Sequence, residues 1–339
     1  MVKSGTLPAP ASRRGAGSRR LACCRRLCGT FFTAIAAAIV LVEAASMFFP
    51  AARAQTVAPR TASPCLNIVA AENFYQDIAR QIAGPYARVE SVLSNPNIDP
   101  HEYEPTVNDA KEVAVANLVI ESGGGYDDWM NKLLSASPNS ARLVINAWDI
   151  SPLKLPDNEH VWYSVEDMKA VAAAMAGDLK KLCPSRAPVF DKNLKIFTGS
   201  LAGIRAKIGG IARRFSGTPI ALTEPIFLYQ AVPMGLKVLT PFALQKAVAQ
   251  GIDPPANTVL IAQDQIRKKM VRLLVYNRQT GDRFTARLKS LAKSSGVPVV
   301  GVMETMPPGK HYQSWMLDQI AAVESALRGS NHGAGSGVR

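Results

Sequence analysis

Two of the four histidines in this 339-residue chain lie in segments that could present them to a metal ion. His101 lies in Asp99-Pro100-His101-Glu102-Tyr103-Glu104-Pro105, where the two prolines restrict the backbone on either side of the imidazole. Thr106-Val107-Asn108-Asp109 follows and has the Ser/Thr-x-x-Asp/Glu pattern of a helix N-terminus. A neutral imidazole on a stiff loop beside carboxylates suits a divalent cation, and a hydrogen-bonded surface histidine is the alternative.

The second histidine, His160, has an equivalent setting. It lies in Asn158-Glu159-His160-Val161-Trp162, and Ser164-x-x-Asp167 then predicts the capped start of a helix that runs to about Leu182. His332 lies in a Gly/Ser-rich tail and is not expected to be a ligand.

Two carboxylates stand out in the second half of the chain. Glu224 follows an expected strand and precedes Pro225, and Glu304 follows another strand and precedes Thr305-Met306-Pro307-Pro308-Gly309. An acid between apolar residues needs a partner, because an unpaired charge in a dry cleft is costly. A solvated loop acid is the alternative for each.

The elements that must position these side chains alternate between short apolar strands and amphipathic helices. Strands are expected over 66–70, 88–93, 118–121, 142–146, 219–222, 236–239, 271–276 and 297–303. Helices are expected over 74–83, 107–115, 165–182, 242–250, 258–269, 283–294 and 312–328. This alternation predicts an α/β fold with parallel sheets, in which ligands bind beyond the carboxyl ends of the strands.

A helical pattern over 188–215 separates the two halves and predicts one long helix joining two (βα) lobes. At 1.5 Å per residue it would be roughly 40 Å long. Gly199, Gly203 and the pair Gly209-Gly210 weaken the pattern, so a kink or two shorter helices are the alternatives.

Gly123-Gly124-Gly125 also follows an expected strand. The segment does not fit G-x-G-x-x-G, because Asp128 occupies the last position, and no P-loop lysine follows. We interpret it as a turn that allows close backbone approach rather than as a phosphate site.

The N-terminus has the order of a secretory signal. Residues 1–26 contain seven Lys/Arg and no acid, an apolar run spans 27–42, and Ala52-Arg53-Ala54 forms an A-x-A cleavage pattern. An uncleaved anchor is the alternative, although a run of 16 residues is shorter than the roughly 18 needed for a span. We therefore expect export to the periplasm or beyond, with cleavage near residue 54.

Charge and cysteine content limit the possible partners. Residues 1–54 carry eight Lys/Arg and one acid, so the remainder keeps only +6 of the net charge of +13. No basic stripe with interleaved aromatic residues occurs, and nucleic acid is not an expected partner. Outside the leader the cysteines are Cys65 and Cys183, which could form a disulfide in an exported protein or remain buried thiols.

The expected organisation therefore has six parts. They are a signal peptide over 1–54, a flexible lead-in over 55–64, an N-terminal α/β lobe over 65–187, a connecting helix over 188–215, a C-terminal α/β lobe over 216–328 and a disordered tail over 329–339.

With the segments around His101 and His160 followed by Glu224 and Glu304, the chain resembles the zinc/manganese substrate-binding proteins of bacterial ABC transporters over about residues 65–328. The resemblance implies two lobes joined by one long helix, with Zn²⁺ or Mn²⁺ bound in the cleft between them by His101, His160, Glu224 and Glu304. It also implies a monomer that delivers the ion to a membrane permease and has no catalytic activity.

The chain departs from the family pattern in three places. The second-histidine segment usually reads Asn-Pro-His and here reads Asn-Glu-His, and the His-rich loop of many zinc-specific members does not occur. The fourth ligand is often Asp, and His311 is an alternative to Glu304 at that position.

Two other functions fit part of the sequence. A secreted zinc hydrolase could use the two histidines and a glutamate, but Pro105 stands where H-E-x-x-H requires its second histidine, and no G-x-S-x-G elbow occurs. A metal-binding surface adhesin with the same fold is the other alternative.

Overall fold

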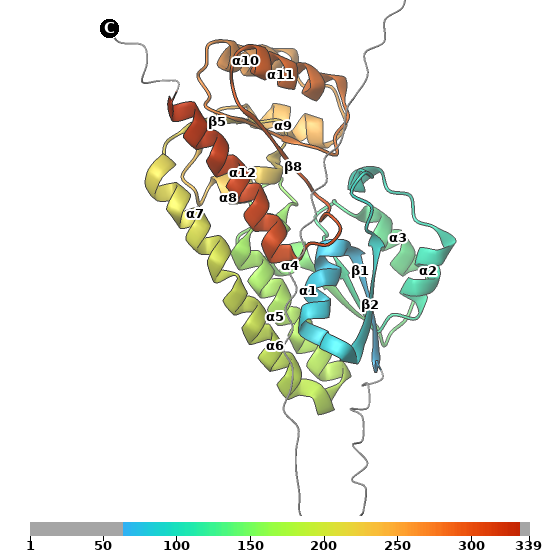
Figure 1. Cartoon of the computed structure of the whole chain (residues 1–339). Coiled ribbons are helices and arrows are strands. Elements are labelled where there is room, and N and C mark those ends of the chain that lie inside the picture. Colours follow the sequence, from blue (N-terminus) through green and yellow to red (C-terminus); the bar gives the residue numbers. More distant parts are fainter. Residues whose placement is uncertain (1–63, 333–339) are drawn as a thin grey trace, which may run out of the picture. The chain divides into compact units, whose positions relative to one another are not determined.

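The structure is a computed structural model that describes residues 64–332 (Figure 1). The predicted signal peptide and almost all of the predicted lead-in lie outside the described residues. Within residues 64–332, no helix is both long and apolar enough to cross a membrane.

The first sheet has four parallel strands in the order β2-β1-β3-β4. They are β1 (Leu66–Glu72), β2 (Ala87–Leu93), β3 (Leu118–Glu121) and β4 (Leu143–Asn146). The helices of this half are α1 (Asn73–Ala83), α2 (Val107–Ala114), α3 (Asp128–Ala136), α4 (Ala147–Ile150) and α5 (Val165–Leu182). Crossovers through helices are what parallel strands require.

The second sheet is also parallel, with the order β6-β5-β7-β8. Its strands are β5 (Pro219–Leu222), β6 (Lys237–Val238), β7 (Leu274–Asn277) and β8 (Val299–Val302). Its helices are α8 (Leu228–Ala231), α9 (Phe242–Ala249), α10 (Ala256–Arg267) and α11 (Arg283–Ser294). The predicted α/β fold with two lobes and parallel sheets is confirmed.

The helical segment between the two sheets is interrupted once. It consists of α6 (Ala187–Ser200) and α7 (Ala202–Phe215), separated by Leu201. The φ and ψ of Leu201 are −68° and −15°, so the backbone stays right-handed through the break. Just before it, the Ser200 hydroxyl donates to the carbonyl of Phe197, a local bond that competes with regular helix geometry. The predicted single helix is therefore divided into two helices, as in the alternative, although the backbone between them remains nearly helical.

The last helix, α12 (Tyr312–His332), lies alongside α7 (Figure 1). The buried Glu324 carboxylate forms ion pairs with Lys207 and Arg214 of α7 and with Arg328, and these partners lower its pKa to about 2. The tail was predicted to be disordered from residue 329, but α12 continues to His332. Residues 333–339 lie outside the described part of the chain.

A cluster of aromatic side chains lies in the core beside the first sheet. Trp162 is fully buried, stacks on Phe74 with ring centroids 4.9 Å apart, and lies 5.1 Å from the ring of His160. Trp315 of α12 lies 5.8 Å from Phe74, so the last helix packs on the same aromatic group. The hydrophobic core thus extends to the candidate site, where Trp162 contacts His160.

Cys65 and Cys183 are reduced in this structure, with their sulfur atoms 3.0 Å apart. Cys65 lies just before β1, and Cys183 directly follows α5. The disulfide therefore stays a prediction. The two sulfur atoms are close enough for the bond to form after a small movement.

After the export that the sequence predicts, we expect this pair to oxidise and to raise the free energy of unfolding by about 2–4 kcal/mol, because the bridge would close a long loop in the unfolded chain. The measurement is urea unfolding of the mature protein with and without reductant. Cys183→Ala is the control, and its stability should not respond to reductant. Two titratable thiols in the unfolded, oxidised protein would contradict this expectation.

Candidate metal centre

His101 is held by the proline-flanked loop on which the sequence analysis placed it. It lies in the 3-10 turn Pro100–Glu102, where its backbone N–H donates to the Asp99 carboxylate over 3.0 Å. The indole of Trp129 donates to the carbonyl of Pro100 over 3.1 Å and fixes the turn against α3. After the turn, Thr106 and Asp109 form the predicted capping box of α2.

His160 is fully buried, and its ring orientation is set by Asn158. The Asn158 side-chain oxygen accepts from the backbone N–H of His160 over 3.2 Å and lies 2.8 Å from its Nδ1. The amide nitrogen of Asn158 donates to the carbonyl of Pro225, which confirms the orientation of the amide. Nδ1 therefore carries the proton, and Nε2 presents its lone pair to the site.

Glu304 follows β8, as predicted, and is also fully buried. Its Oε1 lies 3.0 Å from Nε2 of His160, so a side chain placed by the first sheet meets one placed by the second. The phenol of Tyr126 donates to its Oε2 over 3.4 Å.

Glu224 follows β5 and is 2% exposed. The side-chain amide nitrogen of Asn277 donates to Oε2 of Glu224 over 3.0 Å and to Oε1 of Glu304 over 3.1 Å. One amide group at the end of β7 therefore holds the two carboxylates beside each other.

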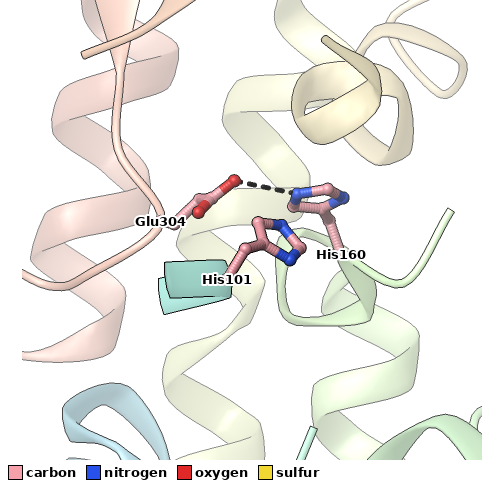
Figure 2. Close-up of side chains that lie close together, drawn as sticks. All are labelled: His101, His160 and Glu304. Atoms are coloured by element: carbon pink, nitrogen blue, oxygen red, sulfur yellow. Dashed lines mark hydrogen bonds and ion pairs between the residues drawn. The ribbon is translucent and has the colours of Figure 1, made fainter. Parts of the chain in front are cut away.

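His101, His160 and Glu304 form the compact part of the candidate site (Figure 2). Each offers one ligand atom, and these atoms all lie within 4.8 Å of one another. Glu224 lies next to this group through Asn277 but is not a member of it. The structure thus brings three of the four sequence-predicted ligands together. The fourth, Glu224, is connected to this group through the side-chain amide of Asn277, which donates to both carboxylates.

Burial sets the protonation of the group. It lowers the pKa of His160, which stays neutral, and it raises the pKa of both Glu224 and Glu304. Negative charge on Glu304 raises the pKa of Glu224 further. With the Nε2 lone pair of His160 facing it, Glu304 donates the hydrogen bond that joins the two residues when its carboxyl group is protonated.

Two atoms in the site have no hydrogen-bond partner among the described residues. They are Nε2 of His101 and Oε1 of Glu224, and both atoms are buried. Orphaned buried polar atoms are rare in folded proteins. An imidazole nitrogen and a carboxylate oxygen left in this way are both suitable ligands for a divalent transition metal.

His311, the alternative to Glu304, lies elsewhere. Its side chain is 74% exposed, and its Nδ1 lies 2.7 Å from the carboxylate of Asp77 on α1. It is not a member of the compact group.

The glycine turn after β3 contributes indirectly. Gly123, Gly124 and Gly125 all have positive φ, and a Cβ at Gly123 would lie 2.1 Å from the side-chain oxygen of Asn146. The predicted turn with close backbone approach is confirmed. It leads directly into Tyr126, whose ring packs edge-on against His101 at 4.8 Å.

Asn277 and Tyr126 were not among the site residues predicted from the sequence. Asn277 ends a strand and Tyr126 follows a glycine turn, so their positions at the strand ends were a usable signal. Their residue types were not, because neither an amide nor a phenol is a typical ligand for a transition metal.

Residues 68–326 match the family described as the periplasmic component A of the zinc-uptake complex. The metal ABC transporter substrate-binding lipoprotein ScbA of Streptococcus cristatus is 24% identical, over 85% of this chain and 97% of its own length. The iron-binding protein YfeA of Yersinia pestis is 25% identical, over 80% of this chain and 87% of its own.

Solved structures share the fold. The periplasmic zinc-binding protein TroA of Treponema pallidum superposes with a TM-score of 0.65 at 19% identity, covering 77% of this chain and 98% of its own. The substrate-binding protein FpvC of Pseudomonas aeruginosa, in complex with Mn²⁺, gives 0.66 at 21% identity and covers 78% and 99%. The family match spans both sheets and all four candidate ligands, and the chain belongs to the family of periplasmic components of zinc-uptake complexes.

Proposed function

We propose that His101, His160, Glu224 and Glu304 are the ligands with which this metal-transport substrate-binding protein captures a divalent transition metal ion. The observation that carries the proposal is the convergence of His101, His160 and Glu304, with the buried Nε2 of His101 left without a hydrogen-bond partner among the described residues. The cation would replace the proton between His160 and Glu304, and it would provide the missing partner for His101 and Glu224.

The chemistry of the ligands suits Zn²⁺ and Mn²⁺. Two neutral imidazoles and two carboxylates offset the charge of a dication, so the buried site would be close to neutral when occupied. Histidine is a good ligand for zinc, and carboxylate oxygens are favoured by manganese. Zinc, manganese, iron and nickel are among the ions named for the relatives and neighbours of this chain.

Capture and delivery follow from the position of the ligands. His101 and His160 come from segments of the first half, whereas Glu224 and Glu304 follow strands of the second sheet. An ion bound by all four would hold the two halves together, and release would require them to separate. We infer that the exported protein acts as a monomer and passes its ion to a membrane permease.

The same ligand set argues against the hydrolase alternative. A catalytic zinc keeps a coordination position open for water, whereas a transport site can be closed by four protein ligands. A metal-loaded crystal structure with an ordered water on the ion and only three protein ligands would favour the hydrolase.

Substitution of single ligands tests the proposal. His101→Ala and Glu304→Ala should each lower the affinity of the mature protein for Zn²⁺ and Mn²⁺ by about 100-fold or more, because each removes a direct ligand. Isothermal titration with each metal, together with metal analysis of the purified protein, is the measurement.

His311→Ala is the matched control for these variants. It removes an exposed imidazole paired with Asp77, and its metal affinity should stay within about twofold of the unsubstituted protein. A large loss of metal affinity in His311→Ala with no loss in Glu304→Ala would show that His311, and not Glu304, is the fourth ligand. A loss in neither His101→Ala nor Glu304→Ala would refute the site.

Metal affinity should also depend on pH. Protons compete with the cation for the carboxylates of Glu224 and Glu304, because burial raises the pKa of both groups. Affinity should therefore fall as the pH is lowered from about 8 to about 5, by about tenfold per pH unit for each proton displaced. Titration in a series of buffers measures this, and a flat profile would contradict the proposed ligand set.

A further inference from the structure

A cleft of about 800 Å³ leads to one side of the candidate metal centre. Among the described residues that line it, His101 is the only one of the four proposed ligands. Glu159, the residue before His160, also lines this cleft. The exposed fractions of the His101 and Glu159 side chains are 25% and 19%, whereas those of His160 and Glu304 are both 0%. The His101 and Glu159 side chains are therefore the part of the candidate site nearest to this cleft, with Nε2 of His101 itself buried behind its surface.

The separation of these two side chains indicates how they could interact. Oε1 of Glu159 lies 4.0 Å from Nε2 of His101. This distance is too long for a hydrogen bond, and Nε2 has no hydrogen-bond partner within residues 64–332. Two donor atoms bound to one ion at about 2.1 Å each can lie up to about 4.2 Å apart. The pair is therefore slightly farther apart than the roughly 3.4 Å between two ligands of one tetrahedral ion, and a small side-chain movement would let both bind the same cation.

We propose that Glu159 is a fifth metal-binding residue, which with His101 forms an outer pair that receives the ion before it passes to His160, Glu304 and Glu224. The proposal rests on the proposed function and adds the route by which the ion reaches the site. A cation between Glu159 and His101 would bridge the 4.0 Å gap that a hydrogen bond cannot span.

The charge of the cleft supports this direction of approach. Five carboxylates and one ammonium group line it, which concentrates cations near His101. These residues are Asp99, Glu102, Asp157, Glu159, Asp282 and Lys246. Lys246 is 3.0 Å from Asp157 and is paired with it. Of the carboxylates, Glu159 is the one within 4.0 Å of a proposed ligand nitrogen.

An outer pair of this kind has a kinetic signature. A residue that binds the ion only in transit lowers the barrier for entering and for leaving by the same amount. Its loss should slow association and dissociation together and leave the equilibrium affinity almost unchanged. A residue that stays bound at equilibrium would instead raise the dissociation rate when it is removed.

The test compares Glu159→Gln with Glu102→Gln in the mature protein. Both variants remove one negative charge from the wall of the same cleft, and Glu102 is exposed. Stopped-flow mixing with Mn²⁺ gives the association rate, and mixing of the loaded protein with a chelator gives the dissociation rate. We expect both rates to fall by about tenfold in Glu159→Gln, with the affinity within about twofold, and each rate in Glu102→Gln to change by less than about threefold.

The other outcomes separate the failures. Equal changes of the two rates in Glu159→Gln and Glu102→Gln would mean that Glu159 acts only through the negative charge that it adds to the cleft. That result would overturn the proposal. A faster dissociation with weaker affinity in Glu159→Gln would make it an equilibrium ligand and overturn it as well, as would rates identical to those of the unsubstituted protein. If the unsubstituted protein binds no Mn²⁺ or Zn²⁺, the proposed function itself fails, which is a different result.

Discussion

The contact between His160 and Glu304 is the constraint on which the rest of the site depends. Both side chains are completely buried, and they belong to segments that follow different sheets. Removal of a carboxylate from water is costly unless its oxygens are hydrogen-bonded, so the two halves of the molecule can meet here only if the surrounding groups satisfy Glu304. Asn277 and Tyr126 do so, one from each half.

Side-chain amides position most of this site. Asn158 orients His160 and also binds the carbonyl of Pro225, beside Glu224. Gln279 accepts from the backbone N–H of Glu304 over 2.6 Å and donates to the carbonyl of Ile98, in the loop that carries His101. An amide has both a donor and an acceptor, so one side chain can join two loops from different halves. The geometry of the candidate ligands is therefore fixed by neutral groups that join the two halves.

The candidate ligands at the strand ends could be predicted from the sequence, whereas the side chains that hydrogen-bond to these ligands could not. Parallel strands gather their carboxyl ends at one edge, so the strand pattern placed Glu224 and Glu304 at the edge where ligands bind, and the family resemblance grouped them with the two histidines. Short-range patterns also located the capped starts of α2 and α5 correctly. Asn277 and Gln279 could not be assigned, because their roles depend on contacts with residues 25 or more positions away in the chain. The break at Leu201 matches the alternative of two shorter helices, whereas the extent of α12 was missed, since single-residue ends depend on local hydrogen bonds.

The choice of neutral partners has an electrostatic consequence. The groups that bind the oxygens of Glu304 are an imidazole, a phenol and an amide, and Asn277 again binds Glu224. By contrast, the buried Glu324 between α12 and α7 is paired with three basic side chains, which lower its pKa to about 2. A fixed cation of that kind would neutralise the candidate site permanently and compete with any ion that arrived. The carboxylates of the candidate site are instead held by neutral groups and have raised pKa values, so a proton stabilises them, and the divalent metal proposed above would stabilise them as well.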